Sequence, residues 1–137
     1  MTSKTTPETK TAPLSLKAAY EVERDRRDAE RRARDEAERK QQEQDLANAE
    51  ALHAILSADP EFLAAKGLTA DRRRYTVSLD HADFRLAAYF EAGRANVTAA
   101  DKRNALAGSA APRRQETVDS VADALRVLAQ FLADETR

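Results

Sequence analysis

The pattern of hydrophobic and polar positions predicts a long helix in the first half of the chain. No Pro or Gly occurs from Ser15 to about Ala58, and Ser15 is a residue type that caps helix starts. Large apolar side chains recur only towards the C-terminal end of this stretch, at Leu52, Ile55 and their neighbours. The pair Asp59-Pro60 then ends the helix, because proline disfavours helical geometry in the residue before it.

The middle of this helix, residues 23–40, is highly charged and contains no apolar residue larger than alanine. Several acidic residues precede a basic residue by four positions, as in Glu23–Arg27 and Asp28–Arg32, and each such pair stabilises a helix by roughly 0.2–0.5 kcal/mol. Two interpretations remain: a solvated helix or loosely paired coiled coil, and a nucleic-acid-binding arm. We favour the first, since charge runs usually face water.

One stretch, RRRYTVSLD at residues 72–80, has the alternation of a β-strand. Tyr75, Val77 and Leu79 fall on one face of it, and polar residues fall on the other. A strand must pair its backbone N–H and C=O groups. Because helices are expected on both sides of it in sequence, we expect this strand to pair with the same strand of a second copy.

Two short helices are predicted after the strand. Asp80 is expected to cap a helix through HADFRLAAYFEA that contains Phe84 and Ala88 and ends at Gly93. Thr98, followed three residues later by Asp101, resembles a capping box that begins a second helix, which Gly108 ends.

The last helix is predicted over residues 113–134. Its apolar residues alternate at steps of three and four and form one seam: Val118, Val121, Leu125, Leu128 and Leu132. The seam is too short for an autonomous coiled coil, so we expect it to pack on the domain or on its mate in a dimer.

These elements predict a mainly α protein. A disordered tail is expected at residues 1–14, a long charged helix or coiled coil at 15–59, and a connector at 60–71. A small strand-helix-helix unit that dimerises through a β-ribbon follows at 72–110, and an amphipathic helix closes the chain at 111–137.

Charge is distributed unevenly along the chain, although the net charge is only -1. Residues 72–114 contain nine Lys or Arg against four Asp or Glu, whereas both flanking segments are acidic. A basic segment between acidic ends predicts a charged partner. The chain has no cysteine, no apolar run of membrane-spanning length and no signal-peptide pattern, so we expect a soluble, cytoplasmic protein with no membrane association.

Catalytic and metal-binding patterns are absent from the sequence. His53 and His81 are its two histidines, and nothing in the sequence brings them together. Asp80-His81-x-Asp83 could hold a metal, but Asp80 is explained as a helix cap and Asp83 as a carboxylate in a first helical turn. No nucleophile elbow, phosphate loop or dinucleotide motif occurs. We expect a protein without enzymatic activity, cofactor or metal.

The order of strand, capped helix, glycine turn and capped helix over residues 72–108 resembles the ribbon-helix-helix family of DNA-binding proteins. The resemblance implies a homodimer whose two-stranded ribbon enters the major groove of duplex DNA. The polar face of the strand would contact bases, and the start of the second helix would contact phosphate. The implied DNA-binding residues are Arg72, Arg73, Arg74, Thr76, Ser78, Arg94, Thr98, Lys102 and Arg103. The implied dimer core comprises Tyr75, Val77, Leu79, Phe84, Ala88, Val118, Val121, Leu125, Leu128 and Leu132.

Two functions are consistent with these patterns. The first is a homodimeric DNA-binding protein, either a transcriptional repressor or an accessory factor for plasmid or phage DNA. The alternative is a non-enzymatic helical scaffold or adaptor that oligomerises and binds a protein partner through residues 16–58. The near-neutral net charge suits the second function better, because a nucleic-acid partner favours a basic protein.

Overall fold

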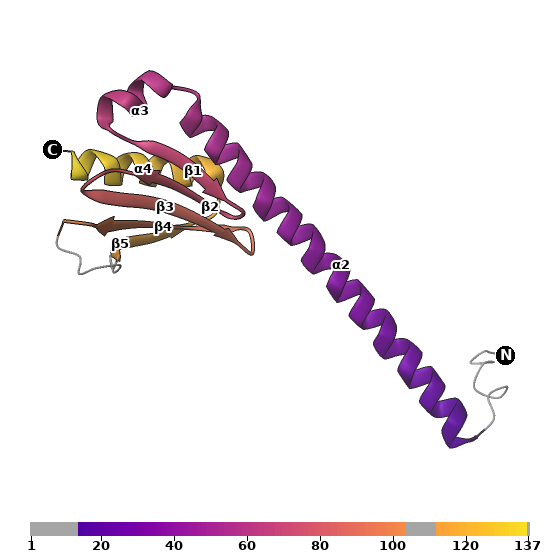
Figure 1. Ribbon diagram of the computed structural model, residues 1–137. Helices are drawn as coiled ribbons and strands as arrows, with labels where there is room; N and C mark the ends of the chain where they lie inside the picture. The colour runs from indigo at the N-terminus through magenta and orange to yellow at the C-terminus, as the bar shows by residue number, and fades with distance from the viewer. Residues whose placement is uncertain (1–13, 104–111, 137) are drawn as a thin grey trace, which may run out of the picture. The chain divides into compact units, whose positions relative to one another are not determined.

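The computed structural model describes residues 14–103 and 112–136 (Figure 1). The elements are, in chain order, α2 (Leu16–Ser57), α3 (Pro60–Lys66), β1 (Thr69–Arg73), β2 (Thr76–Asp80), β3 (Phe84–Glu91), β4 (Arg94–Asp101), β5 (Pro112–Val118) and α4 (Val121–Glu135). The chain divides into two compact units, residues 1–39 and residues 40–137. The predicted tail lies outside the described residues except for Leu14, and so does Gly108.

The second unit is built on a five-stranded antiparallel sheet. Its strands follow one another in space in the order of the sequence, β1-β2-β3-β4-β5, so each strand pairs with the next one along the chain. The protein is therefore α+β, and the prediction of a mainly α fold with a two-stranded ribbon is wrong.

The predicted dimeric ribbon is replaced by strand pairing within one chain. Tyr75 lies in a turn, and the strand that follows it, β2, pairs with β1 on one side and β3 on the other. Val77, for example, is opposite Arg72 in β1 and Ala88 in β3. Both edges of β2 are thus satisfied by neighbouring segments, and its backbone needs no second copy.

The first helix predicted after the strand is the β-strand β3. Residues 98–101, the start of the second predicted helix, belong to the β-strand β4, and residues 104–108 of that helix lie outside the described residues. In β3 the buried residues alternate with exposed ones: Phe84, Leu86, Ala88 and Phe90 are buried, whereas Arg85, Tyr89 and Glu91 are exposed. In β4 the residues Ala95, Val97 and Ala99 are buried in the same alternating way. The high alanine content favoured helix locally, but burial of one face of each strand against the core outweighs that weak preference.

The residues predicted as helix caps in this region have other roles. Thr98 and Asp101 belong to β4, and Asp80 ends β2. Gly93 stops no helix but forms, with Ala92, the turn between β3 and β4. Both turn residues have positive φ, 55° at Ala92 and 80° at Gly93, which is the two-residue hairpin geometry that matches the twist of paired strands.

The last predicted helix is part strand and part helix. Val118 belongs to β5, whose register opposite β4 places it against Ala95. The helix α4 begins only at Val121, where the Ser120 hydroxyl accepts a hydrogen bond from the Asp123 N–H. The amphipathic character of the segment is confirmed, because Leu128 and Leu132 are buried.

Predictions for the first helical region are confirmed. The helix α2 covers 42 residues, and Ser15 caps it by accepting a hydrogen bond from the Ala18 N–H. Asp59 ends the region and caps α3 through the Phe62 N–H. Gly67 closes α3 with a φ of 69°, a left-handed conformation that glycine adopts without steric cost.

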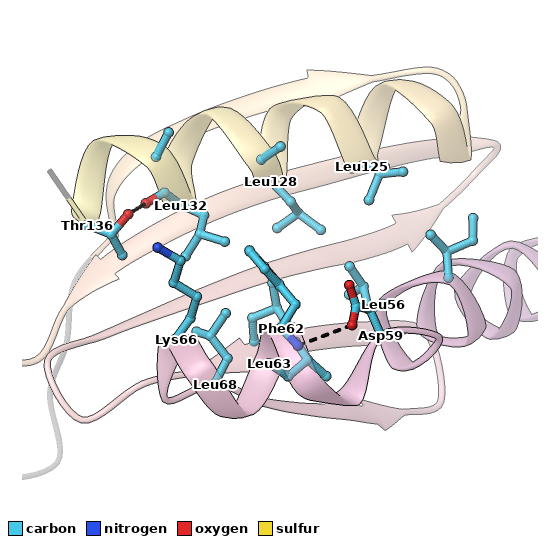
Figure 2. Close-up of a pocket in the computed structure, with 14 residues that line it drawn as sticks. Leu56, Asp59, Phe62, Leu63, Lys66, Leu68, Leu125, Leu128, Leu132 and Thr136 are labelled. Atoms are coloured by element: carbon cyan, nitrogen blue, oxygen red, sulfur yellow. Dashed lines mark hydrogen bonds between the residues drawn. The ribbon is translucent and has the colours of Figure 1, made fainter.

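One face of the sheet is covered and carries the core. Helix α4, helix α3 and the C-terminal part of α2 lie on this face (Figure 2). Ala49 and Leu52 of α2 are fully buried in the same cluster as Val77, Leu86 and other inward residues of the strands. The opposite face carries a row of small and polar residues that are aligned across the strands: Asp71, Ser78, Ala87, Thr98 and Gln115.

Candidate functional site

The predicted DNA-contacting residues are not gathered on one surface. Arg73 and Arg74 lie at the β1–β2 turn, and the sheet register places the β3–β4 turn, with Arg94, at the same end of the sheet. Lys102 and Arg103 follow β4 at the opposite end. Thr76 is half-buried, Thr98 is half-buried on the polar sheet face, and Ser78 is only 5% exposed.

Most of the predicted cationic residues already contact carboxylates of their own chain. Lys102 Nζ lies 3.1 Å from Asp80 Oδ1 and donates a second hydrogen bond to the His81 carbonyl. Arg103 pairs with Asp101, and their hydrogen bond raises the pKa of the Arg103 guanidinium. Such pairs hold the end of β4 against its neighbours and reduce the positive potential there.

The remaining arginines of this set lie near acidic groups or an aromatic ring. Arg72 lies 3.9 Å from Glu50 of α2, Arg73 lies 4.0 Å from Asp71, and Arg94 lies 3.9 Å from Asp119. Arg74 has a φ of 52° and stands 5.5 Å from the centroid of the Tyr75 ring. The sheet end that carries these residues therefore has mixed charge.

The predicted dimer-core residues are packed within a single chain. Val77, Leu79, Phe84, Ala88, Val118, Leu128 and Leu132 are buried, Val121 and Leu125 are half-buried against the same cluster, and Tyr75 is half-buried in the β1–β2 turn. The hydrophobic pattern of the sequence thus identified residues that are buried or half-buried in the fold. A second copy is not needed to bury them.

The first part of α2, up to Gln44, is a surface that buries none of its side chains. The first buried residue of the helix is Asp45. Ion pairs run along this surface, including Arg27 to Glu23 at 3.0 Å and Arg31 to Asp28 at 3.1 Å. Hydrogen bonds from Arg26, and then from Arg27, lower the pKa of Glu23 from 4.5 to about 2.

The same surface also exposes large apolar side chains at its N-terminal end. Leu16 is 87% exposed, Tyr20 is 60% exposed and Val22 is 69% exposed. A solvated charged helix has no need of such residues, so their clustering within two turns marks this end of α2 as a contact surface. Leu16 and Tyr20 are four residues apart and share one face of the helix, whereas Val22, two residues after Tyr20, lies on another side. The charge pattern did not predict this surface, although the spacing of Leu16 and Tyr20 in the sequence is a signal for it.

An apolar groove lies between α3 and α4, with a volume of about 450 Å³ (Figure 2). Its floor includes Leu68 and Leu79, and Leu125 and Leu128 form part of the α4 wall. Phe62 of α3 faces it and is 44% exposed. The groove joins segments that are far apart in sequence, so the hydrophobic pattern alone could not have predicted it.

A second hollow, of about 620 Å³, lies on the polar face of the sheet beside the β3–β4 turn. Tyr89, Glu91, Arg94 and Asn96 are among its lining residues. Asn96 Oδ1 accepts no hydrogen bond from the part of the chain that the structure describes. The hollow is lined by an acidic side chain, a basic side chain and an aromatic ring. Its lining residues include no nucleophile placed beside a general base.

Neither histidine is part of a metal or catalytic cluster in the described residues. His81 stacks on Phe84 with ring centroids 4.4 Å apart, and its Nδ1 accepts the Asp83 N–H. His53 Nε2 lies 3.5 Å from Ser57 Oγ on the surface of α2. Within residues 14–103 and 112–136, no group of three His, Cys, Asp or Glu side chains could hold a metal ion.

Comparisons with known proteins add no family to this description. No family model, curated protein or solved structure matches the chain. In the described parts of the chain, no helix has both the length and the apolar character to cross a membrane.

Proposed function

We propose that this protein is a non-enzymatic assembly protein that self-associates through the exposed part of α2, residues 16–44. The observation that carries the proposal is that this stretch of helix buries no side chain and yet exposes Leu16, Tyr20 and Val22. A single helix in water has little stability beyond its local ion pairs. Pairing with another helix through the face that Leu16 and Tyr20 share would bury these two side chains and stabilise both helices.

The charge of this helix supports a second copy as its partner. Residues 16–39 contain eight Lys or Arg and eight Asp or Glu, so two copies do not repel each other at long range. Opposite charges alternate along the helix, which allows ion pairs across an interface. A helix that is electrically neutral over this length has no electrostatic attraction for the phosphates of DNA.

Among residues 14–103 and 112–136, the geometry offers no support for DNA binding as a second candidate. The proposal of a groove-reading ribbon depended on an unpaired strand, and β2 is an interior strand of the sheet. The basic residues expected to contact phosphate are divided between opposite ends of that sheet. An exposed helix with balanced charge suits a protein partner better than it suits a nucleic acid.

Sedimentation equilibrium of the full chain tests the proposal. We expect a mass of at least twice the 15.2 kDa chain mass at micromolar concentration. A double variant, Leu16→Glu and Tyr20→Glu, is expected to sediment as a monomer, because it places four carboxylates in the interface of a dimer. The matched control is Tyr89→Glu, which changes an exposed aromatic residue on the sheet and should keep the wild-type mass.

Two results would count against self-association through α2. One is a wild-type chain that stays monomeric at high concentration. The other is an oligomer that survives the double variant but not Tyr89→Glu. A gel shift with random-sequence duplex at low salt examines the competing hypothesis directly, and we expect no complex.

A further inference from the structure

The groove between α3 and α4 has two ends of different charge. Lys66 and Thr136 lie at one end, and Asp59 lies beside Leu56 and Leu125 at the other (Figure 2). The Thr136 hydroxyl already donates to the Leu132 carbonyl. Asp59 is engaged as well, since its carboxylate accepts the Phe62 N–H. The groove therefore offers one cationic group, the Lys66 ammonium, beside a surface of leucine side chains.

Lys66 has no ion-pair partner among the residues that the structure describes. Its ammonium instead faces the Phe62 ring, whose centroid lies 6.0 Å from Nζ. An ammonium at the rim of an apolar groove favours an anion attached to an apolar body.

Helix α3 forms one wall of the groove and contacts the core only through the half-buried Leu63. None of its seven residues is fully buried. Asp59 precedes the helix, Pro60 is its first residue, and Gly67, with positive φ, follows it. A wall with so few buried contacts can move at small cost, so a ligand can enter without disturbing the sheet.

The dimensions of the groove determine which kind of ligand it can hold. Its α4 wall runs from Leu125 to Thr136, which is about 16 Å at 1.5 Å per helical residue. A groove of this length, with a volume of about 450 Å³ and a lining of leucine side chains, has room for one extended unbranched chain.

We propose that this groove binds a free fatty acid, a single-chain carboxylate of about twelve carbons. A chain of that length extends to about 14 Å, from C–C bonds of ~1.5 Å, and so fits the groove. Its alkyl part would lie against Leu68, Leu79 and Leu128, with the carboxylate at the Lys66 ammonium. The Asp59 carboxylate at the rim disfavours an anionic head there, which fixes the direction of the chain.

A chain-length series tests the apolar part of the site. Isothermal titration calorimetry of the full chain is measured with octanoate, decanoate and dodecanoate below their micelle concentrations. We expect the affinity to increase about fourfold for each added methylene, the factor that burial of a CH₂ group produces. An affinity that does not depend on chain length would overturn the proposal, as would the absence of binding.

Two substitutions locate the site, each with a matched control. Ala129→Trp fills the groove from an exposed position on α4 and should weaken dodecanoate binding at least tenfold, whereas Gln130→Trp, its exposed neighbour outside the groove, should leave binding unchanged. Lys66→Glu should weaken dodecanoate binding at least tenfold and strengthen binding of dodecyltrimethylammonium. Lys17→Glu, the same change far along the sequence, should do neither.

Circular dichroism confirms that each variant is folded before binding is compared. Equal binding to wild type and Ala129→Trp would place the ligand elsewhere and refute the proposal. If Ala129→Trp instead lowered the solution mass and the wild type bound no carboxylate, the groove would be an interface between copies. The proposed self-association depends on residues 16–44 and not on the groove. Failure of the fatty-acid proposal would therefore not refute self-association, which the variants in residues 16–44 test separately.

Discussion

Asp45 on α2 accepts hydrogen bonds from the backbone N–H of Gly93 at 3.0 Å and of its neighbour Ala92 at 2.9 Å, in the β3–β4 turn. The Asp45 side chain also accepts from Gln41 Nε2 at 3.0 Å, and the residue is only 4% exposed. Three donors thus compensate a carboxylate that is almost removed from water. This contact joins segments 48 residues apart and holds the last third of α2 on the sheet.

Asp45→Ala is expected to destabilise the protein by about 2–3 kcal/mol, because it leaves two backbone donors of the turn unsatisfied. Urea unfolding followed by circular dichroism measures the change. Glu50→Ala is the control, since its side chain is 55% exposed and lies 3.9 Å from Arg72, a pair that contributes about 0–1 kcal/mol at most. Equal effects of the two substitutions would show that the turn does not depend on Asp45.

The β3–β4 turn offers a matched pair of substitutions at adjacent positions. Gly93→Ala is expected to cost about 1–2 kcal/mol, because a side chain at its φ of 80° strains the backbone. A Cβ there would meet only Gln41 Nε2, at 3.6 Å, so a clash is not the cause. Ala92→Gly should be neutral or stabilising by up to about 1 kcal/mol, since Ala92 already has positive φ. Thermal unfolding of both variants tests this opposite response.

Leu52→Ala is expected to destabilise the protein by about 2–5 kcal/mol, the range for a leucine removed from a packed core. Leu52 has no exposed surface. Leu16→Ala, in the same helix but 87% exposed, should change stability by less than about 0.5 kcal/mol when the protein is studied at monomeric concentrations. Chemical denaturation of both variants compares the buried and exposed parts of one helix. Similar losses in the two would contradict this division of α2.

The ionised form of Glu23 is favoured by Arg26 and Arg27, and its pKa of about 2 lies below the usual 4.5. A carboxyl whose pKa is lowered on folding stabilises the helix fully above pH 4.5. That contribution is lost as the pH falls from about 4.5 to about 2. The effect on helicity should be small and should weaken in salt, because the side chain is 45% exposed.

Carboxyl ¹³C NMR of the full chain measures this titration at the residue itself. In the wild type we expect the Glu23 midpoint near pH 2. The Arg26→Ala variant should move it upwards towards 4.5, and the double variant with Arg27→Ala should move it further. A midpoint that is unchanged in both variants would mean that the two arginines do not hold the carboxylate in solution.

The candidate surfaces differ in how far the sequence could predict them. The charged helix followed from composition and from ion-pair spacing within a single element, but the exposed apolar side chains on which the proposed self-association rests were not singled out. The groove did not, because Leu68, Phe62 and Leu128 come from three separate elements and become neighbours only after the chain folds. Nothing in the sequence distinguishes Lys66 from the other lysines as a ligand-binding residue, because its place at the groove is set by the fold.

The sequence by itself determined the elements whose signals are local. The cap at Ser15, the helix end at Asp59-Pro60 and the three-four spacing of the apolar residues in α4 depend on hydrogen bonds and side chains within a few residues, and these features were predicted correctly. The tertiary structure alone decided that β3 and β4 are strands. Their alanine-rich segments satisfy a helical pattern and an alternating one equally well. Pairing with neighbouring strands, and packing of α2 and α4 side chains on one face of the sheet, favour the strand. Many of these contacts join residues that are distant in the sequence.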